Sequence, residues 1–117
     1  MLKPQINYED FDKVDIRIGN VIKVEDFPEA RKPAYQLTID FGPAIGIKKS
    51  SGQFVKNHQK EDLFGKQVIC VVNFPPKQIG PFTSEVLTLG PDDGTGEESN
   101  WIALTTLKEV PLGREVK

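Results

Sequence analysis

The sequence has few of the residues that usually carry out chemistry. Its 117 residues include one cysteine, Cys70, and one histidine, His58. A lone cysteine cannot form an internal disulfide, and no cluster of histidine, cysteine and aspartate has the spacing of metal ligands. The sequence also lacks a Gly-x-Ser-x-Gly motif and a phosphate-binding glycine loop. These absences predict a protein that is not an enzyme and that holds no metal and no cofactor.

Long hydrophobic runs are missing as well. The longest apolar runs have about five residues, whereas a membrane-spanning helix needs about 20. Residues 1–4 lack the apolar core of a signal peptide. With 38% hydrophobic and 27% charged residues, the composition is that of one globular domain. We therefore expect a single cytoplasmic domain over residues 1–117, without membrane insertion.

The charged residues are unevenly distributed. The formal net charge is −2, but residues 31–77 contain eight Lys or Arg and only three Asp or Glu, whereas both flanking segments are acidic. A basic block can present a positive face to phosphates even on an acidic protein. The folded chain could equally mix the three segments in space, which would remove that face.

Alternating apolar residues indicate a mainly β protein. Tyr35, Leu37, Ile39 and Phe41 show the clearest alternation. The predicted strands cover residues 14–24, with a bulge or sharp coil at Gly19-Asn20, and residues 35–41, 44–49, 68–72 and 83–89. Short helices are predicted after Asn7 and over residues 59–64, the second ending at Gly65.

This order of elements is typical of a five-stranded Greek-key OB-fold barrel with a short helix between the third and fourth strands. The barrel core would cover about residues 14–90, with terminal extensions at residues 1–13 and 91–117. The extensions carry more apolar residues than two exposed tails can hold. We expect a dimer interface there, formed by Tyr8, Phe11, Trp101, Ile102, Leu104 and Leu107.

The segment between the last two predicted strands is a candidate binding rim. Pro75 and Pro76 cannot continue a strand ladder, so this segment should form a loop at the end of the barrel. Such loops are held by a rigid scaffold and remain accessible to a partner. Asn73, Lys77 and Gln78 are the candidates, although Asn73 could instead cap a turn and Lys77 could be solvated.

Motifs along the chain resemble a known family. They are Asp15-Ile16-Arg17-Ile18-Gly19, Ile39-Asp40-Phe41-Gly42, Ser51-Gly52, Leu63-Phe64-Gly65-Lys66 and Asn73-x-x-Pro76, with Ser84 eleven residues after Asn73. In this order they resemble the tRNA-binding domain appended to methionyl- and phenylalanyl-tRNA synthetases. Residues 26–35, 72–77 and 84–87 are similar to the stand-alone CsaA family.

The resemblance implies an OB-fold homodimer that acts as an export-related chaperone. Its partners would be unfolded or precursor polypeptides and the motor SecA, on a scaffold otherwise used for tRNA. Ser51, Asn73 and Ser84 match the tRNA-binding pattern, and Lys77 falls where that pattern often has a base. Gln78 replaces a basic residue common in tRNA-binding relatives, so phosphate contacts should be fewer.

Two functions follow, a polypeptide-binding chaperone and a tRNA-binding module. Either ligand would use the same rim, which we predict to contain Lys48, Lys49, Ser50, Ser51, Asn73, Phe74, Lys77, Gln78, Phe82, Ser84 and Glu85. The aromatic residues Phe27, Phe74 and Phe82 would serve apolar peptide segments or base stacking if they are exposed, and neither if they are core.

Overall fold

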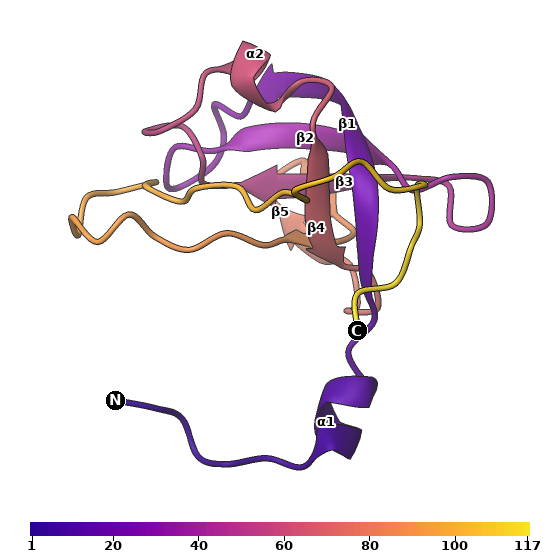
Figure 1. Cartoon of the computed structure of the whole chain (residues 1–117). Coiled ribbons are helices and arrows are strands. Elements are labelled where there is room, and N and C mark those ends of the chain that lie inside the picture. The colour runs from indigo at the N-terminus through magenta and orange to yellow at the C-terminus, as the bar shows by residue number, and fades with distance from the viewer.

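The computed structural model describes residues 1–117, and most of its strands form one antiparallel sheet that curls into a nearly closed barrel (Figure 1). The strand order is β3-β2-β1-β4-β7. The barrel strands are β1 (Ile16–Asp26), β2 (Tyr35–Asp40), β3 (Ile47–Gly52), β4 (Gln67–Val71) and β7 (Leu87–Thr88). The remaining elements are α1 (Tyr8–Asp12), α2 (Lys60–Leu63), β5 (Lys77–Ile79) and β6 (Phe82–Ser84). The predicted mainly β OB-fold, with a short helix between the third and fourth strands, is confirmed.

The barrel interior is built by strict alternation in β2. Tyr35, Leu37 and Ile39 are buried, while the residues between them are half-buried. They pack in a cluster of ten buried residues that also includes Phe41 and Phe54. Each of these side chains removes apolar surface from water, which is the main force that holds the barrel closed.

The long strand β1 bends at a different residue from the one predicted. The register with β2 shifts between Val21 and Lys23, so the irregularity lies at Ile22 and the prediction of a bulge at Gly19-Asn20 is wrong. Gly19 has another role, because a Cβ atom there would lie 2.4 Å from Ile39 Cγ2. The glycine thus permits close packing across the barrel. A glycine in a strand can mark either a bulge or such a close approach, and the sequence alone does not distinguish the two.

The third strand begins later than predicted. Residues 44–46 form a turn in which Gly46 has a φ of +89°, and β3 then continues through Gly52. Its last residues, which the sequence suggested would close the strand, pair with the start of β2. Ser50 therefore faces the interior and is fully buried.

The predicted last strand, residues 83–89, is divided between two sheets. β6 pairs with β5 in a separate hairpin, whereas β7 pairs with β4 as the fifth barrel strand. Between them, the backbone N–H groups of Glu85 and Val86 both donate to the carbonyl oxygen of Lys49. These bonds place the segment between β6 and β7 against β3 and so close the barrel.

The two termini behave differently. α1 and the residues before it stand away from the barrel, and every residue from 1 to 10 is exposed (Figure 1). The C-terminal segment instead lies on the barrel without forming the strand that residues 101–107 suggested. The Gly113 N–H donates to Ile18 O at 2.8 Å, and the Val116 N–H donates to Ile16 O. The C-terminal segment is thus part of the fold.

No helix of the structure has the length and apolar character needed to cross a membrane.

Candidate ligand-binding cleft

The largest hollow on the surface is an open cleft of about 860 Å³ beside the β5–β6 hairpin. The loop of residues 27–34 forms one wall, with Arg31 and Lys32. β5 contributes Lys77 and Gln78, and the end of β3 contributes Ser51. The cleft joins segments that lie far apart in the sequence, as the folding of an OB barrel requires.

A pair of aromatic rings holds the cleft walls together. The rings of Phe27 and Phe82 lie 5.2 Å apart between centroids, and together with Ala34 they form a small buried cluster separate from the barrel core. Phe27 is 4% exposed and Phe82 is 7% exposed. Of the two alternatives that we left open for these rings, the structure shows the buried one. The prediction that Phe82 belongs to the accessible rim is therefore wrong, because both rings fasten the loop to the hairpin.

The lining of the cleft is polar and carries both signs of charge. Arg31, Lys32 and Lys77 are its cations, and Glu29 and Glu98 are its anions. Only three of its twelve lining residues are hydrophobic. A ligand would consequently meet hydrogen-bonding groups and both signs of charge beside apolar surface.

A second hollow, of about 260 Å³, adjoins the first at Lys77. Its lining includes Phe74, Pro75, Val86 and Leu87, and it is mainly apolar. The Phe74 side chain is 51% exposed, so this ring is available to a ligand. Lys77 therefore stands between a polar cleft and an apolar hollow.

The Asn73 side chain bonds to the backbone near the N-terminal arm and does not line the cleft. Its Oδ1 accepts a hydrogen bond from the Asp15 N–H at 2.9 Å, and its Nδ2 donates to the Lys13 carbonyl oxygen at 2.7 Å. The side-chain amide is thus occupied by the backbone at the base of the N-terminal arm. The turn cap that we left open for Asn73 is not what the structure shows, because both bonds reach a segment that is distant in the sequence.

Three further predicted site residues seal the barrel. Ser84 Oγ accepts a hydrogen bond from the Ser51 N–H at 3.1 Å, and Glu85 Oε1 accepts one from the Lys49 N–H at 3.0 Å. Ser50 Oγ accepts a hydrogen bond from Thr88 Oγ1 at 2.8 Å inside the barrel. The Ser84 and Glu85 oxygens take the place of ladder bonds between β3 and the segment before β7, and both residues also line the hollow of about 260 Å³.

The structure does not bring all the predicted bases together. Lys77 lines both hollows, whereas Lys48 and Lys49 line neither. Gln78 lies in the cleft, but its amide bonds to its own hairpin, donating to Gly80 O at 2.8 Å and accepting from Thr83 Oγ1 at 2.7 Å.

Sequence reasoning missed Arg31, Lys32, Gln53 and Glu98 as lining residues. The first two lie within the basic block, in a loop bracketed by prolines, and these two signals together could have found them. Glu98 could not be found in this way, because its position depends on how the loop of residues 91–100 is anchored.

Asp93 anchors that loop. Its carboxylate pairs with Lys56 Nζ at 2.5 Å and accepts a hydrogen bond from Asn100 Nδ2 at 2.8 Å. The hydrogen bond from Lys56, followed by those from Thr95, holds the pKa of Asp93 well below its usual range. Ser99 Oγ donates to the Pro33 carbonyl oxygen, so the loop is also tied to the opposite wall of the cleft.

The lone cysteine and histidine lie away from both hollows. Burial raises the pKa of the Cys70 thiol to about 12, against the opposing effect of a hydrogen bond with Thr88. His58 is half-buried, and its Nε2 accepts a hydrogen bond from the Ala103 N–H at 3.1 Å. Both residues serve the packing of the fold.

These features define a class of protein, an OB-fold domain with an open, charged cleft beside its β5–β6 hairpin. The "Putative tRNA binding domain" family matches residues 16–115. The chain belongs to this family and, within it, to the CsaA-like tRNA-binding domains.

The comparisons include enzymes and free-standing domains. The methionine–tRNA ligase of Pyrococcus horikoshii is 35% identical over 117 residues, which cover 96% of this chain and 14% of the ligase. The chain thus spans about one seventh of the length of such curated relatives. The crystal structures of the chaperone CsaA from Bacillus anthracis and from Picrophilus torridus are 46% and 48% identical to it. Both have a TM-score of 0.87, and both matches cover 97% of this chain and 100% of the other.

Proposed function

We propose that this protein is a non-catalytic molecular chaperone of CsaA type that binds unfolded or precursor polypeptides before export. The mixed charge of the 860 Å³ cleft is the observation that carries this proposal. A polypeptide offers both carboxylates and ammonium groups, as well as backbone donors and acceptors, and such a ligand suits a cleft that contains both Arg31 and Glu98. The full-length likeness to the two CsaA chaperones supports the same function.

The charges disfavour a ligand that is negative along its whole length. Glu29 and Glu98 lie in the cleft, and the formal net charge of the chain is −2. Phosphodiester ligands gain most of their affinity from cations that replace counterions. Two carboxylates in the same cleft oppose that gain.

A tRNA-binding module is the second candidate function. Arg31, Lys32 and Lys77 share one cleft, and the exposed ring of Phe74 stands beside it, where a base could stack. The family match and the methionine–tRNA ligases support this alternative.

A paired titration separates the two functions. The probes are reduced, carboxymethylated α-lactalbumin as a permanently unfolded polypeptide, and bulk tRNA, each measured over a salt series. Binding of the polypeptide with a shallow salt dependence supports the chaperone. Binding of tRNA alone, with a slope that falls by about one to two units in Lys49→Ala with Lys77→Ala, would favour the RNA function.

We also propose that the protein acts as a cytoplasmic homodimer and delivers clients to SecA. The apolar residues of the protruding arm, Leu2, Ile6 and Tyr8, support self-association because nothing in the chain covers them. Co-elution of the purified protein with SecA, in the presence and absence of an unfolded client, tests the second partner.

A further inference from the structure

The β5–β6 hairpin leaves one strand edge open toward the cleft. The two strands form a sheet of their own, so each has a partner on one side only. The other side of β6 faces β3, because Ser84 accepts the hydrogen bond from Ser51. The other side of β5 has no strand beside it, and Lys77, Gln78 and Ile79 all line the cleft. An unpaired strand edge in a cleft can accept another extended chain.

The turn geometry identifies which backbone groups are open. Gly80, with a φ of +57°, and Pro81 form the two-residue turn that joins Ile79 to Phe82. The pair next to such a turn is hydrogen-bonded, and hydrogen-bonded pairs alternate with pairs that are not. Gln78 therefore belongs to a non-hydrogen-bonded pair, and its N–H and C=O point away from β6 and toward the open edge. Gln78 makes no backbone hydrogen bond outside the hairpin.

Prolines limit how a partner strand can use this edge. Pro76 precedes β5 and Pro81 follows it in the turn, and neither has an N–H to donate. The open donor and acceptor of Gln78 are thus isolated, which fixes the register of an added strand. The same prolines protect the edge against indiscriminate pairing with other sheets.

The side chains around this edge match an extended polypeptide. Arg31 and Lys32 line the cleft together with Glu29 and Glu98, and Lys77 leads to the apolar hollow that contains Phe74 and Leu87. Successive side chains of a strand point to opposite sides. A strand with charged residues at one set of alternate positions, acidic ones for the cations and basic ones for the carboxylates, and with apolar residues at the other set suits these two hollows.

We propose that a client polypeptide binds as an extended strand added to the free edge of β5, pairs with the backbone of Gln78 and places charged and apolar side chains in the two hollows. This inference rests on the proposed chaperone function, for which it supplies the binding mode. RNA cannot form such a ladder, because it has no alternating N–H and C=O groups along its backbone.

N-methylation of the ligand tests the binding mode. The probe is a capped octapeptide in which leucine alternates with glutamate or lysine, prepared in three forms: unmodified, N-methylated at every leucine and N-methylated at every charged residue. One edge of an added strand faces β5 and the other faces solvent, so only one methylated form should lose affinity, by about tenfold or more. Binding of the unmodified peptide should also slow hydrogen exchange of the Gln78 amide.

Charge variants with a matched control test the side-chain contacts. Arg31→Glu with Lys32→Glu should weaken the unmodified peptide about fivefold or more. Lys66→Glu with Lys108→Glu makes the same change in net charge at exposed residues outside both hollows, and should leave the affinity within twofold.

The outcomes separate this inference from the proposed function. If the unmodified peptide binds and both methylated forms bind equally well, strand addition is wrong and the chaperone function stands. If neither the peptide nor carboxymethylated α-lactalbumin binds, the chaperone function itself fails. Binding of tRNA alone would contradict both.

Discussion

Polar side chains at the barrel rim complete the fold before they are available to a ligand. Three of these rim residues are of types that can bind phosphates or peptides, namely Asn73, Ser84 and Glu85. Each of them bonds instead to backbone groups of a distant segment. The bond from the Ser51 N–H to Ser84 is partly buried, and a buried backbone N–H without a partner costs about 1 to 3 kcal/mol. The fold therefore uses these oxygens first, and the residues left for recognition are the longer cations around the cleft.

Asn73→Ala tests this assignment. The substitution removes the bonds to Lys13 O and Asp15 N, and it should lower the free energy of unfolding by about 1 kcal/mol. It should also speed hydrogen exchange of the Asp15 amide while ligand affinity changes less than twofold. A large loss of affinity in a folded variant would instead make Asn73 part of the binding site.

Phe82→Ala should lower the free energy of unfolding. The ring is 7% exposed and packs on Phe27, so truncation leaves a cavity beneath the cleft wall and should cost about 3 kcal/mol. Urea unfolding followed by far-UV circular dichroism measures the loss. Phe74→Ala is the matched control, because that ring is 51% exposed, and it should change the free energy of unfolding much less.

Cys70 should be unreactive in the folded protein. Its pKa of about 12 leaves a thiolate fraction on the order of 10⁻⁴ at pH 8, and the thiol is fully buried. Ellman's reagent should therefore label it only after denaturation. Rapid labelling of native protein would show that β4 opens readily.

At the scale of elements, the sequence predicts the barrel strands better than their boundaries. The alternation of Tyr35, Leu37 and Ile39 identifies β2 correctly because one face of that strand is buried along its whole length. The alternation of apolar residues cannot separate β6 from β7. The pattern before and after Glu85 would be the same whether the partner strand is β5, as for β6, or β4, as for β7. The choice between partners depends on contacts with β3, which are distant in sequence.

The candidate site divides in the same way. Lys77 and Gln78 could be predicted as accessible residues beside the prolines, although they lie in strand β5 and the predicted loop at this position is wrong. Arg31 and Glu98 could not be placed together, because the loops that carry them are joined by the Ser99–Pro33 hydrogen bond, whose partners lie 66 residues apart in the sequence.

The loop of residues 91–100 should lose stability in acid through Asp93. The pKa of this carboxyl is lowered in the folded state, so its contribution is complete above the unfolded value of about 3.9 and is lost as the pH falls below it. Asp93→Asn should therefore melt at a lower temperature than the unsubstituted protein at pH 7. The difference should shrink below about pH 4, and a constant difference down to pH 2 would contradict the assignment. Asp92→Asn is the control, because Asp92 does not pair with Lys56.

At the scale of the whole molecule, one of the two terminal extensions, the C-terminal one, packs on the barrel. Trp101 packs edge-to-face on Phe54 at 6.0 Å, and the residues that follow hydrogen-bond along β7 and β1. Ile102 and Leu104 keep about 39% of their surface exposed, and Leu107 is entirely exposed. Removal of residues 101–117 would uncover the buried Ile18, so that deletion cannot report on association alone.

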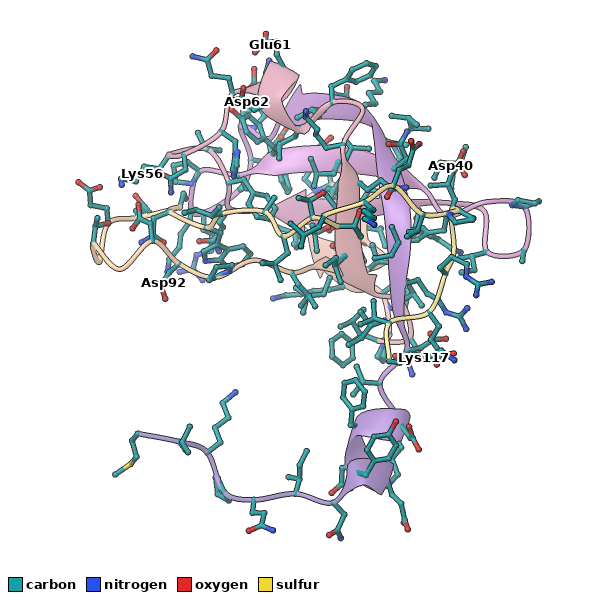
Figure 2. The ribbon with its side chains drawn as sticks, in the orientation of Figure 1. Asp40, Lys56, Glu61, Asp62, Asp92 and Lys117 are labelled. Atoms are coloured by element: carbon teal, nitrogen blue, oxygen red, sulfur yellow. The ribbon has the colours of Figure 1, made fainter.

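The N-terminal arm offers a cleaner test of dimerisation. Leu2 is 97% exposed, Ile6 66% and Tyr8 68%, and the arm lies clear of the barrel (Figure 2). A stable two-fold interface buries more than about 1,000 Å², and the arm can supply much of this area if it lies on a second copy. Light scattering at micromolar concentration should therefore give twice 13.1 kDa.

Deletion of residues 1–12 should return the protein to a monomer without unfolding it, since α1 contains no buried residue. Leu2→Ser with Ile6→Ser and Tyr8→Ser should have the same effect, whereas the control Lys3→Ala should remain dimeric. A mass of 13.1 kDa for the intact chain would overturn the dimer. If the dimer forms, it presents two clefts, and a long unfolded client should then bind with greater avidity than the octapeptide only where both clefts can be reached at once.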